Sequence, residues 1–271
     1  MIPALLRHAT VVALLAAPLW AQAFVFAVNE GVTYRVTDEE IRARYAAIST
    51  DLSKLLNQPV RVEPVASYPV LRKGLADKAY DLALVHPMHI SAIAIKNSGY
   101  KLVATTKGFE KYTASFLVRA DSAVKTLADL KGMRLGAPDE DSITSWMVRA
   151  SVRDALGKPD AVAYTYTRYQ DAVPFFVEHT LTHSGATASN AVVKKWESTG
   201  GKVLFKSKSV PIKNVLAGPG MSASDLEKVR DYFLTLDTTE AGRKKLEPLK
   251  VQGYAAYDAA AFMALGAWLG L

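Results

Sequence analysis

Short apolar runs alternate with amphipathic segments along most of this chain, a pattern that favours strands separated by helices. The first predicted strands are 25–29, 60–64, 81–85 and 102–105. After the first strand, Thr37 and Glu40 have the spacing of a capping box, and apolar residues then recur every three or four positions to Leu56. Further helices are expected from Ser67 and over 90–96. This order predicts a parallel sheet with helices on both faces.

A second alternating set begins after Tyr112. Its expected strands are 114–118, 133–137, 162–166 and 203–205, and its expected helices are 126–132, 142–156, 170–178 and 190–198. A third stretch supplies a strand at 214–217, helices at 222–236 and 241–246, and a small apolar tail at 258–271 that we expect to pack against the first domain. Since no flexible linker separates the sets, we infer two closely joined α/β lobes with more than one crossing strand, which would allow closure about a hinge.

The first 23 residues have the pattern of a secretory signal peptide. Arg7 supplies a short positive segment, residues 9–20 are apolar, and residues 21–23 form an Ala-Gln-Ala cleavage site. The apolar stretch is too short for a stop-transfer helix, so the sequence predicts cleavage after Ala23 and export to a bacterial periplasm; an uncleaved anchor is the alternative. The chain contains no cysteine, which excludes a lipid-anchored form, disulfides and thiolate metal sites.

Composition and missing motifs narrow the class of protein. Half of the 271 residues are apolar and 22% are charged, which permits a sizeable core and argues against general disorder. The net charge of +7 comes from spread basic residues, including a lysine-rich region at 194–213 that we expect on a solvated face. Without aromatic interleaving or a nucleic-acid motif, no nucleic-acid partner is expected. No phosphate-cradling glycine loop, serine elbow or zinc-protease motif occurs, so neither a catalytic centre nor a cofactor is expected.

The strongest chemical signal is the segment 137–145. A strand end and a turn lead into a helix with Ser142 at the expected N-cap and Thr144 and Ser145 in the first turn. Unpaired N–H groups, the partial positive charge of a helix start and these hydroxyls suit an oxyanion. Helix capping by Ser142 is the alternative. The acidic residues 139–141 oppose an anion unless they point away or bind a ligand's amine.

Other candidates stand at strand ends and at the junction of the two sets. His86 follows the strand 81–85, at the edge where open α/β sheets bind ligands, although it could also cap or pack in the turn. Tyr112 lies at the junction, and Tyr34 is a further aromatic candidate for lining a cleft. Arg168 occupies a strand-to-helix turn, where it could face an anion or solvent.

Two histidine pairs have spacings compatible with a metal. They are His86 with His89 and His179 with His183. No acidic fourth ligand stands out, and the second pair brackets an expected helix end. No metal site is therefore predicted.

Four segments, taken in order, resemble a known family. They are 80–85, 112–118, 127–132 and 141–145. The chain resembles the phosphate/phosphite/phosphonate-binding proteins of ABC importers, within the type II periplasmic-binding fold, over essentially all of the sequence after the leader. The segment 127–132 is shared by many type II binders, whereas Tyr112 before a crossing strand together with the Ser-x-Thr helix start is narrower. The resemblance implies two α/β lobes with a ligand cleft between them: lobe I from 24–113 and 214–271, and lobe II from 114–213.

The resemblance also implies binding residues. Family members hold the anion with a junction tyrosine and with hydroxyl and N–H groups at the helix start, which here are Tyr112, Ser142, Ile143, Thr144 and Ser145. His86 stands in a turn where many relatives have small residues, and His183 where relatives often have an Asp-Ala-Gly stretch. Two histidines facing each other across the cleft would favour an anion or a different substrate.

The predicted function is a periplasmic solute-binding protein that captures a small oxyanion, such as a phosphonate, phosphite or phosphate, for an ABC importer. It is expected to be a monomer that catalyses no reaction, with the small anionic ligand and the importer permease subunits as partners. The alternatives are a subunit presenting its ligand to a membrane receptor or kinase, a binder of another solute such as a sulfonate, and an enzyme resembling the thiamine-pyrimidine synthases that share the fold. A metal-binding role for the histidines also stays open.

Overall fold

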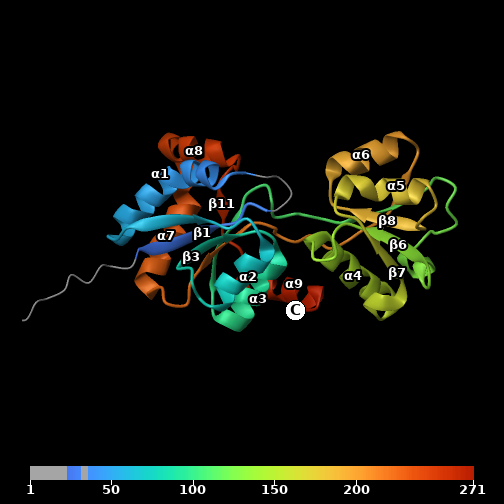
Figure 1. Ribbon diagram of the computed structural model, residues 1–271, viewed down its shortest axis with the longest axis horizontal. Coiled ribbons are helices and arrows are strands. Elements are labelled where there is room, and N and C mark those ends of the chain that lie inside the picture. The colour runs from blue at the N-terminus through green and yellow to red at the C-terminus, as the bar shows by residue number, and fades with distance from the viewer. Residues whose placement is uncertain (1–22, 32–35) are drawn as a thin grey trace, which may run out of the picture.

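The strands form two sheets that lie in separate halves of the molecule (Figure 1). The structure is a computed structural model that describes residues 23–31 and 36–271. The predicted leader, apart from Ala23, and Tyr34 lie outside the described residues. Among the helices described, none is long and apolar enough to cross a membrane. We refer to the half built on the six-stranded sheet as lobe I and to the other as lobe II.

The sheet of lobe I has the strand order β11-β4-β10-β3-β1-β2. Its strands are β1 (Phe24–Val28), β2 (Val60–Pro64), β3 (Leu82–Val85), β4 (Lys101–Thr106), β10 (Asn214–Ala217) and β11 (Tyr254–Ala255). Strands β1, β2 and β3 pair in parallel, as predicted, whereas β10, for which no direction was predicted, runs antiparallel to both β3 and β4 between them. The reason is the path of the chain, because β10 returns from lobe II and enters the sheet from the edge at which β3 ends.

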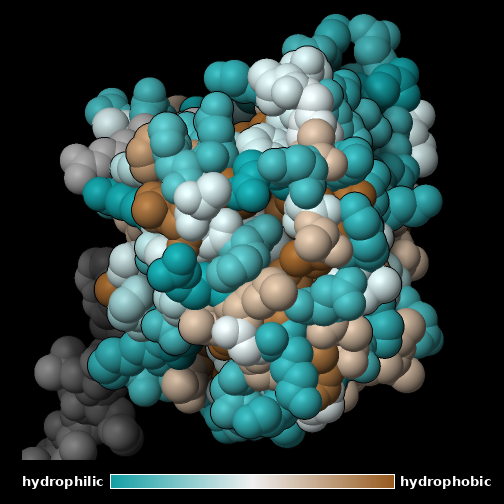
Figure 2. All heavy atoms as spheres, turned by 90° about the vertical axis from the view of Figure 1, so that its right-hand side faces the viewer, coloured by the Kyte–Doolittle hydropathy of each residue, from teal (hydrophilic) through white to brown (hydrophobic). Residues whose placement is uncertain are grey.

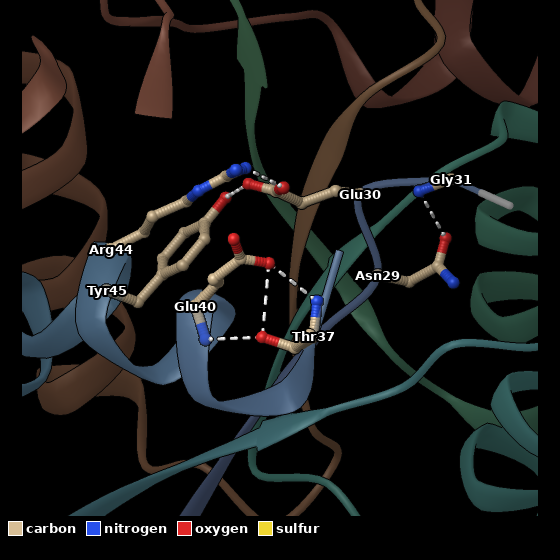
Figure 3. Close-up of polar contacts among 7 residues, drawn as sticks. All are labelled: Asn29, Glu30, Gly31, Thr37, Glu40, Arg44 and Tyr45. Atoms are coloured by element: carbon tan, nitrogen blue, oxygen red, sulfur yellow. Dashed lines mark hydrogen bonds and ion pairs between the residues drawn. The ribbon is translucent and has the colours of Figure 1, made fainter. Parts of the chain in front are cut away.

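Helices cover both faces of this sheet (Figure 1). They are α1 (Asp38–Leu56), α2 (Tyr68–Ala76), α3 (Met88–Ser98), α7 (Ala223–Thr235) and α8 (Glu240–Leu246). The predicted capping box begins α1: Glu40 N donates to Thr37 Oγ1 (3.2 Å), and Thr37 N donates to Glu40 Oε2 (2.8 Å) (Figure 3). One stripe of α1, with Ile41 and Ile48, is buried against the sheet, and this burial fixes the face that the helix presents.

The sheet of lobe II has the order β7-β6-β8-β5-β9. Its strands are β5 (Ser115–Val118), β6 (Arg134–Ala137), β7 (Ala163–Tyr166), β8 (Ser184–Thr187) and β9 (Lys202–Lys206). The sequence did not predict β8, because its small residues carry no apolar signal. Close packing explains why a glycine occupies position 185. A Cβ there would lie 2.6 Å from a methyl carbon of Val173 and 2.8 Å from one of Val177.

The helices of lobe II are α4 (Ile143–Leu156), α5 (Val173–Glu178) and α6 (Asn190–Ser198). The predicted helix over 126–132 is a short 3-10 turn, Leu127–Leu130. On the end face of this lobe, apolar side chains are interspersed among polar ones (Figure 2). Exposed Phe175 and Leu181 belong to this lobe.

The C-terminal helix α9 (Ala259–Leu269) packs on both lobes, not on the first alone. It contacts α3 in lobe I and α4 in lobe II, and it lies between the two halves in Figure 1. Arg153 of α4 donates to the Trp268 carbonyl (2.7 Å), and Trp268 Nε1 donates to Asp154 Oδ2 (2.8 Å). The tail therefore links the lobes.

Two chain segments cross between the lobes side by side. Tyr112 N donates to the Val210 carbonyl (3.0 Å), and Val210 N donates to the Tyr112 carbonyl (2.9 Å). We propose the lobe limits 24–113 with 214–271, and 114–213; the strand composition of the two sheets supports them.

Candidate ligand-binding site

The start of α4 uses most of its hydroxyl groups on itself. Ser142 is the N-cap, and its Oγ accepts from Ser145 N (3.2 Å). Ser145 Oγ donates to the Pro138 carbonyl (3.0 Å), and Ser145 is only 1% exposed. Ser142 therefore caps the helix, which was the alternative to a role in binding. The N–H groups of Ile143 and Thr144 have no acceptor within the helix, because the first turn of an α-helix offers none.

The hydroxyl of Thr144 is the one that meets a group from outside the helix. Its Oγ1 lies 3.3 Å from Tyr112 Oη, and Thr144 is completely buried. Tyr112 Oη accepts from Gln170 Nε2 (2.8 Å), while Gln170 Oε1 accepts from Thr187 Oγ1 (3.1 Å). Gln170 thus fixes the orientation of the tyrosine hydroxyl. Gln170 was not among the residues predicted for the site, although it lies two positions after Arg168, in the same turn.

The facing edge of the lobe I sheet carries His86 and Lys213. Asn214 at the start of β10 is paired with Val85 at the end of β3, so the residues on either side, Lys213 and His86, share one sheet edge. His86 Nδ1 is buried without a hydrogen-bond partner among the residues described. Burial, with smaller contributions from Lys213 and His89, lowers the pKa of His86 to about 3. The imidazole is therefore neutral near pH 7.

A histidine of α3 contacts the first turn of α4 across the lobe junction. The His89 ring stacks on Trp146, with centroids 5.3 Å apart, and is 1% exposed. Neither ring nitrogen has a hydrogen-bond partner in the described part of the chain; the nearest carboxylate, Asp141 Oδ1, is 3.8 Å from Nε2. Burial outweighs Asp141 and lowers the pKa of His89.

The carboxylate of Asp141 is paired across the same junction. Arg72 of α2 lies 2.8 Å from it, and His89 and Arg72 lower its pKa to about 2. Of the acidic residues 139–141, Asp141 therefore lies at the junction, where the charge of Arg72 balances its negative charge. Asp139 and Glu140 are exposed, and Asp139 Oδ1 accepts from Asp141 N (2.9 Å).

A second carboxylate, near the edge of the lobe I sheet, is also paired with a positively charged side chain. Glu30, just after β1, points toward α1, where its carboxylate lies 2.8 Å from Arg44 Nη1 and 3.0 Å from Tyr45 Oη (Figure 3). Asn29 Oδ1 accepts from Gly31 N (3.2 Å) in the same turn. The Glu30 carboxylate is therefore engaged by its partners on α1.

The structure brings some of the predicted residues together and separates others. The α4 start and Tyr112 are adjacent, whereas exposed Arg168 stacks on Tyr169, with its Cζ 5.2 Å from the ring centroid. His183 lies at the other end of the lobe II sheet: its N–H donates to the Arg134 carbonyl (2.9 Å), where β6 begins. The expected pair of facing histidines is therefore wrong, because α4 follows the opposite end of β6.

We looked at the junction for two further features, a cluster of metal ligands and a groove. In the two described ranges, no group of three or more potential ligands could hold a metal ion. A groove of about 500 Å³ lies elsewhere, lined by residues that include Phe205, Lys208 and Trp268. None of the predicted site residues lines it.

A family model described as "ABC transporter, phosphonate, periplasmic substrate-binding protein" matches residues 31–262. The chain belongs to this phosphonate-binding family. The resemblance inferred from the sequence, the type II fold and the class of function are thereby confirmed. Family membership makes the protein a substrate-binding component of transport and places it in the periplasm.

Solved structures agree with the fold of the family. XAC2383 from Xanthomonas citri, bound to ATP, is similar with a TM-score of 0.70 and 13% identity, over 92% of this chain and 97% of that one. PhnD1 from Prochlorococcus marinus, in complex with methylphosphonate, has a TM-score of 0.62 and 13% identity, over 91% and 96%. The sulphonate-binding protein SsuA of Escherichia coli has a TM-score of 0.52 and 15% identity, over 92% and 83%. A search of curated proteins finds no match.

Proposed function

We propose that this phosphonate-family protein captures a small phosphonate-like oxyanion between its lobes and delivers it to ABC importer permeases. The observation that carries the proposal is the meeting of Thr144 and Tyr112 beside a helix start with unused N–H groups. The anion would accept from the N–H groups of Ile143 and Thr144 and from the two hydroxyls. The partial positive charge at the start of α4 favours such a ligand.

The energetics are sufficient for capture. Micromolar affinity needs about −8 kcal/mol. Hydrogen bonds to a charged group contribute roughly 1.5–3 kcal/mol each, so four or five suffice after the costs of ordering and association. The α4 start and Tyr112 supply four donors.

Access to this site requires movement of the lobes. Thr144 is fully buried, and the contacts Arg72–Asp141 and His89–Trp146 join the two lobes at the same helix start. We propose that these contacts open for ligand entry and form again on closure. A partly exposed ion pair of this kind contributes about 1 kcal/mol, so it does not prevent opening.

Titration of the purified protein tests the proposal. We expect calorimetry and tryptophan fluorescence to detect binding of an alkylphosphonate, phosphite or phosphate, with Trp146 beside His89 as a reporter of closure. Alkylsulfonates are included because they share the tetrahedral oxyanion. The ligand should be recovered unchanged, as expected without catalysis. Absence of both signals with every compound would defeat the proposed ligand class.

A further inference from the structure

Lys213 is a half-buried cation at the end of the lobe I sheet, next to His86. It lies in the segment that returns to lobe I, where its carbonyl accepts from Thr106 N (3.0 Å) and its Nζ lies 4.2 Å from the centre of the Phe109 ring. Across residues 23–31 and 36–271, no carboxylate lies within 4.0 Å of its ammonium group. The expectation of a solvated face is wrong for this lysine, because the residue is half-buried and its ammonium group lies over the Phe109 ring.

The neighbouring charges leave Lys213 uncompensated. Glu30 acts on it electrostatically, but the Glu30 carboxylate is engaged by Arg44 and Tyr45. Asp141 is engaged by Arg72. His86, which shares the sheet edge, is neutral and adds no charge. Burial lowers the pKa of Lys213, as expected for an ammonium group that has lost part of its water shell.

The position of this cation relative to the α4 start decides what it can recognise. The α4 start belongs to lobe II, whereas Lys213 lies at the lobe I sheet edge beside His86. A ligand that reached from the α4 start to this end of the lobe I sheet would meet hydroxyl and N–H donors on one side and an ammonium group on the other. A second acidic group would bind there, and an amine would meet like charge.

We propose that Lys213 determines specificity and that the ligand is a small phosphonate carrying a second acidic group, such as a carboxylate. The inference rests on the proposed function, since it places the phosphonate at the α4 start. The second acidic group pairs with Lys213 when the lobes close. Aminoalkylphosphonates are disfavoured for the same reason.

Three phosphonates that differ in the second group test this: phosphonoacetate carries a carboxylate, 2-aminoethylphosphonate an amine and methylphosphonate neither, and each is titrated by calorimetry. We expect the unchanged protein to bind phosphonoacetate about tenfold tighter than methylphosphonate, and 2-aminoethylphosphonate weakest, because a close charge pair gives roughly one factor of ten. Lys213→Met, which removes the charge but keeps an unbranched side chain of similar length, should abolish the preference. Lys213→Arg should retain it, and Lys206→Met, which alters an exposed lysine of β9, is the matched control.

The outcomes separate the two levels of the proposal. Equal affinity for phosphonoacetate and methylphosphonate in the unchanged protein overturns the role of Lys213 and leaves the oxyanion site standing. The same holds for an unchanged affinity ratio in a Lys213→Met protein whose thermal unfolding shows that it is folded. Failure of all three probes to bind overturns this inference, and it overturns the proposed function as well if phosphite, phosphate and the alkylsulfonates also fail to bind.

Discussion

Two helix starts meet at the lobe junction, and they satisfy their polar side chains to different extents. Both serines at the start of α4 are satisfied locally, since Ser142 caps the helix and Ser145 bonds to the Pro138 carbonyl, whereas Trp146 Nε1 in the same turn is buried without a partner in the described chain. The start of α3 follows Pro87, which makes no side-chain cap bond, and His89 in its first turn has two ring nitrogens without partners in the described chain. The number of hydroxyls is thus a poor guide to binding capacity.

The distribution of unpaired polar groups indicates which part of a ligand each lobe recognises. An unpaired polar atom in the interior costs about 1–3 kcal/mol, so several at one edge require an explanation. In lobe I, His86, His89 and Lys213 retain unused hydrogen-bonding capacity or charge. In lobe II, Thr144 supplies the one first-turn hydroxyl that contacts a residue outside the helix and its preceding turn. We infer that lobe II fixes the oxyanion and lobe I selects among its substituents.

The largest expected effect concerns buried His86 and pH. Its folded-state pKa is about 3, whereas an unfolded histidine titrates near 6.5. Between these values only the unfolded state takes up the proton, so the free energy of unfolding falls as the pH falls from about 6.5. The slope is at most about 1.4 kcal/mol per pH unit for this one group. Urea unfolding of the unchanged protein and His86→Gln from pH 8 to 4 measures it.

We expect His86→Gln to flatten this slope. His183→Gln alters an exposed ring at the far end of the lobe II sheet and is the matched control. Equal slopes for the unchanged protein and His86→Gln would show that His86 takes up its proton at the same pH in the folded and the unfolded state.

The second effect tests the division of roles within the first turn of α4. Thr144→Val keeps the shape but removes the hydroxyl, so binding of methylphosphonate should weaken by at least about 1 kcal/mol, roughly fivefold. Ser145→Ala should change affinity little, because that hydroxyl is bonded to Pro138. Calorimetry of both variants measures the contrast. Unchanged affinity in Thr144→Val removes Thr144 from the site.

The smallest effect separates capping from binding. Ser142→Ala removes the side-chain acceptor of Ser145 N, and the loss of such a cap lowers the free energy of unfolding by about 1 kcal/mol. Urea unfolding measures this loss, and calorimetry with methylphosphonate should show less than a twofold change. A large loss of affinity with unchanged stability would instead assign Ser142 to the ligand.

Several elements were predictable because their signals are local. The Thr37–Glu40 capping box begins α1, and Ser142 begins α4, because cap residues act within one turn of their own helix. Strand β8 was not predictable, because its small residues reflect the close approach of α5. The order of residues along the chain also left open which histidines would share an edge, and the structure separates His183 from His86.

By itself, the sequence determined the alternation of strands and helices, the helix caps and the phosphonate-binding family. Each depends on residues close together in the chain or on the order of short segments. Only the tertiary structure decided that β10 runs between β3 and β4, that Gln170 orients Tyr112, and that Lys213 lies half-buried without a carboxylate partner among the described residues. Burial and charge pairing depend on contacts between segments that are far apart in the sequence, such as β10 with β3 and β4, and a local pattern of residues does not specify such contacts.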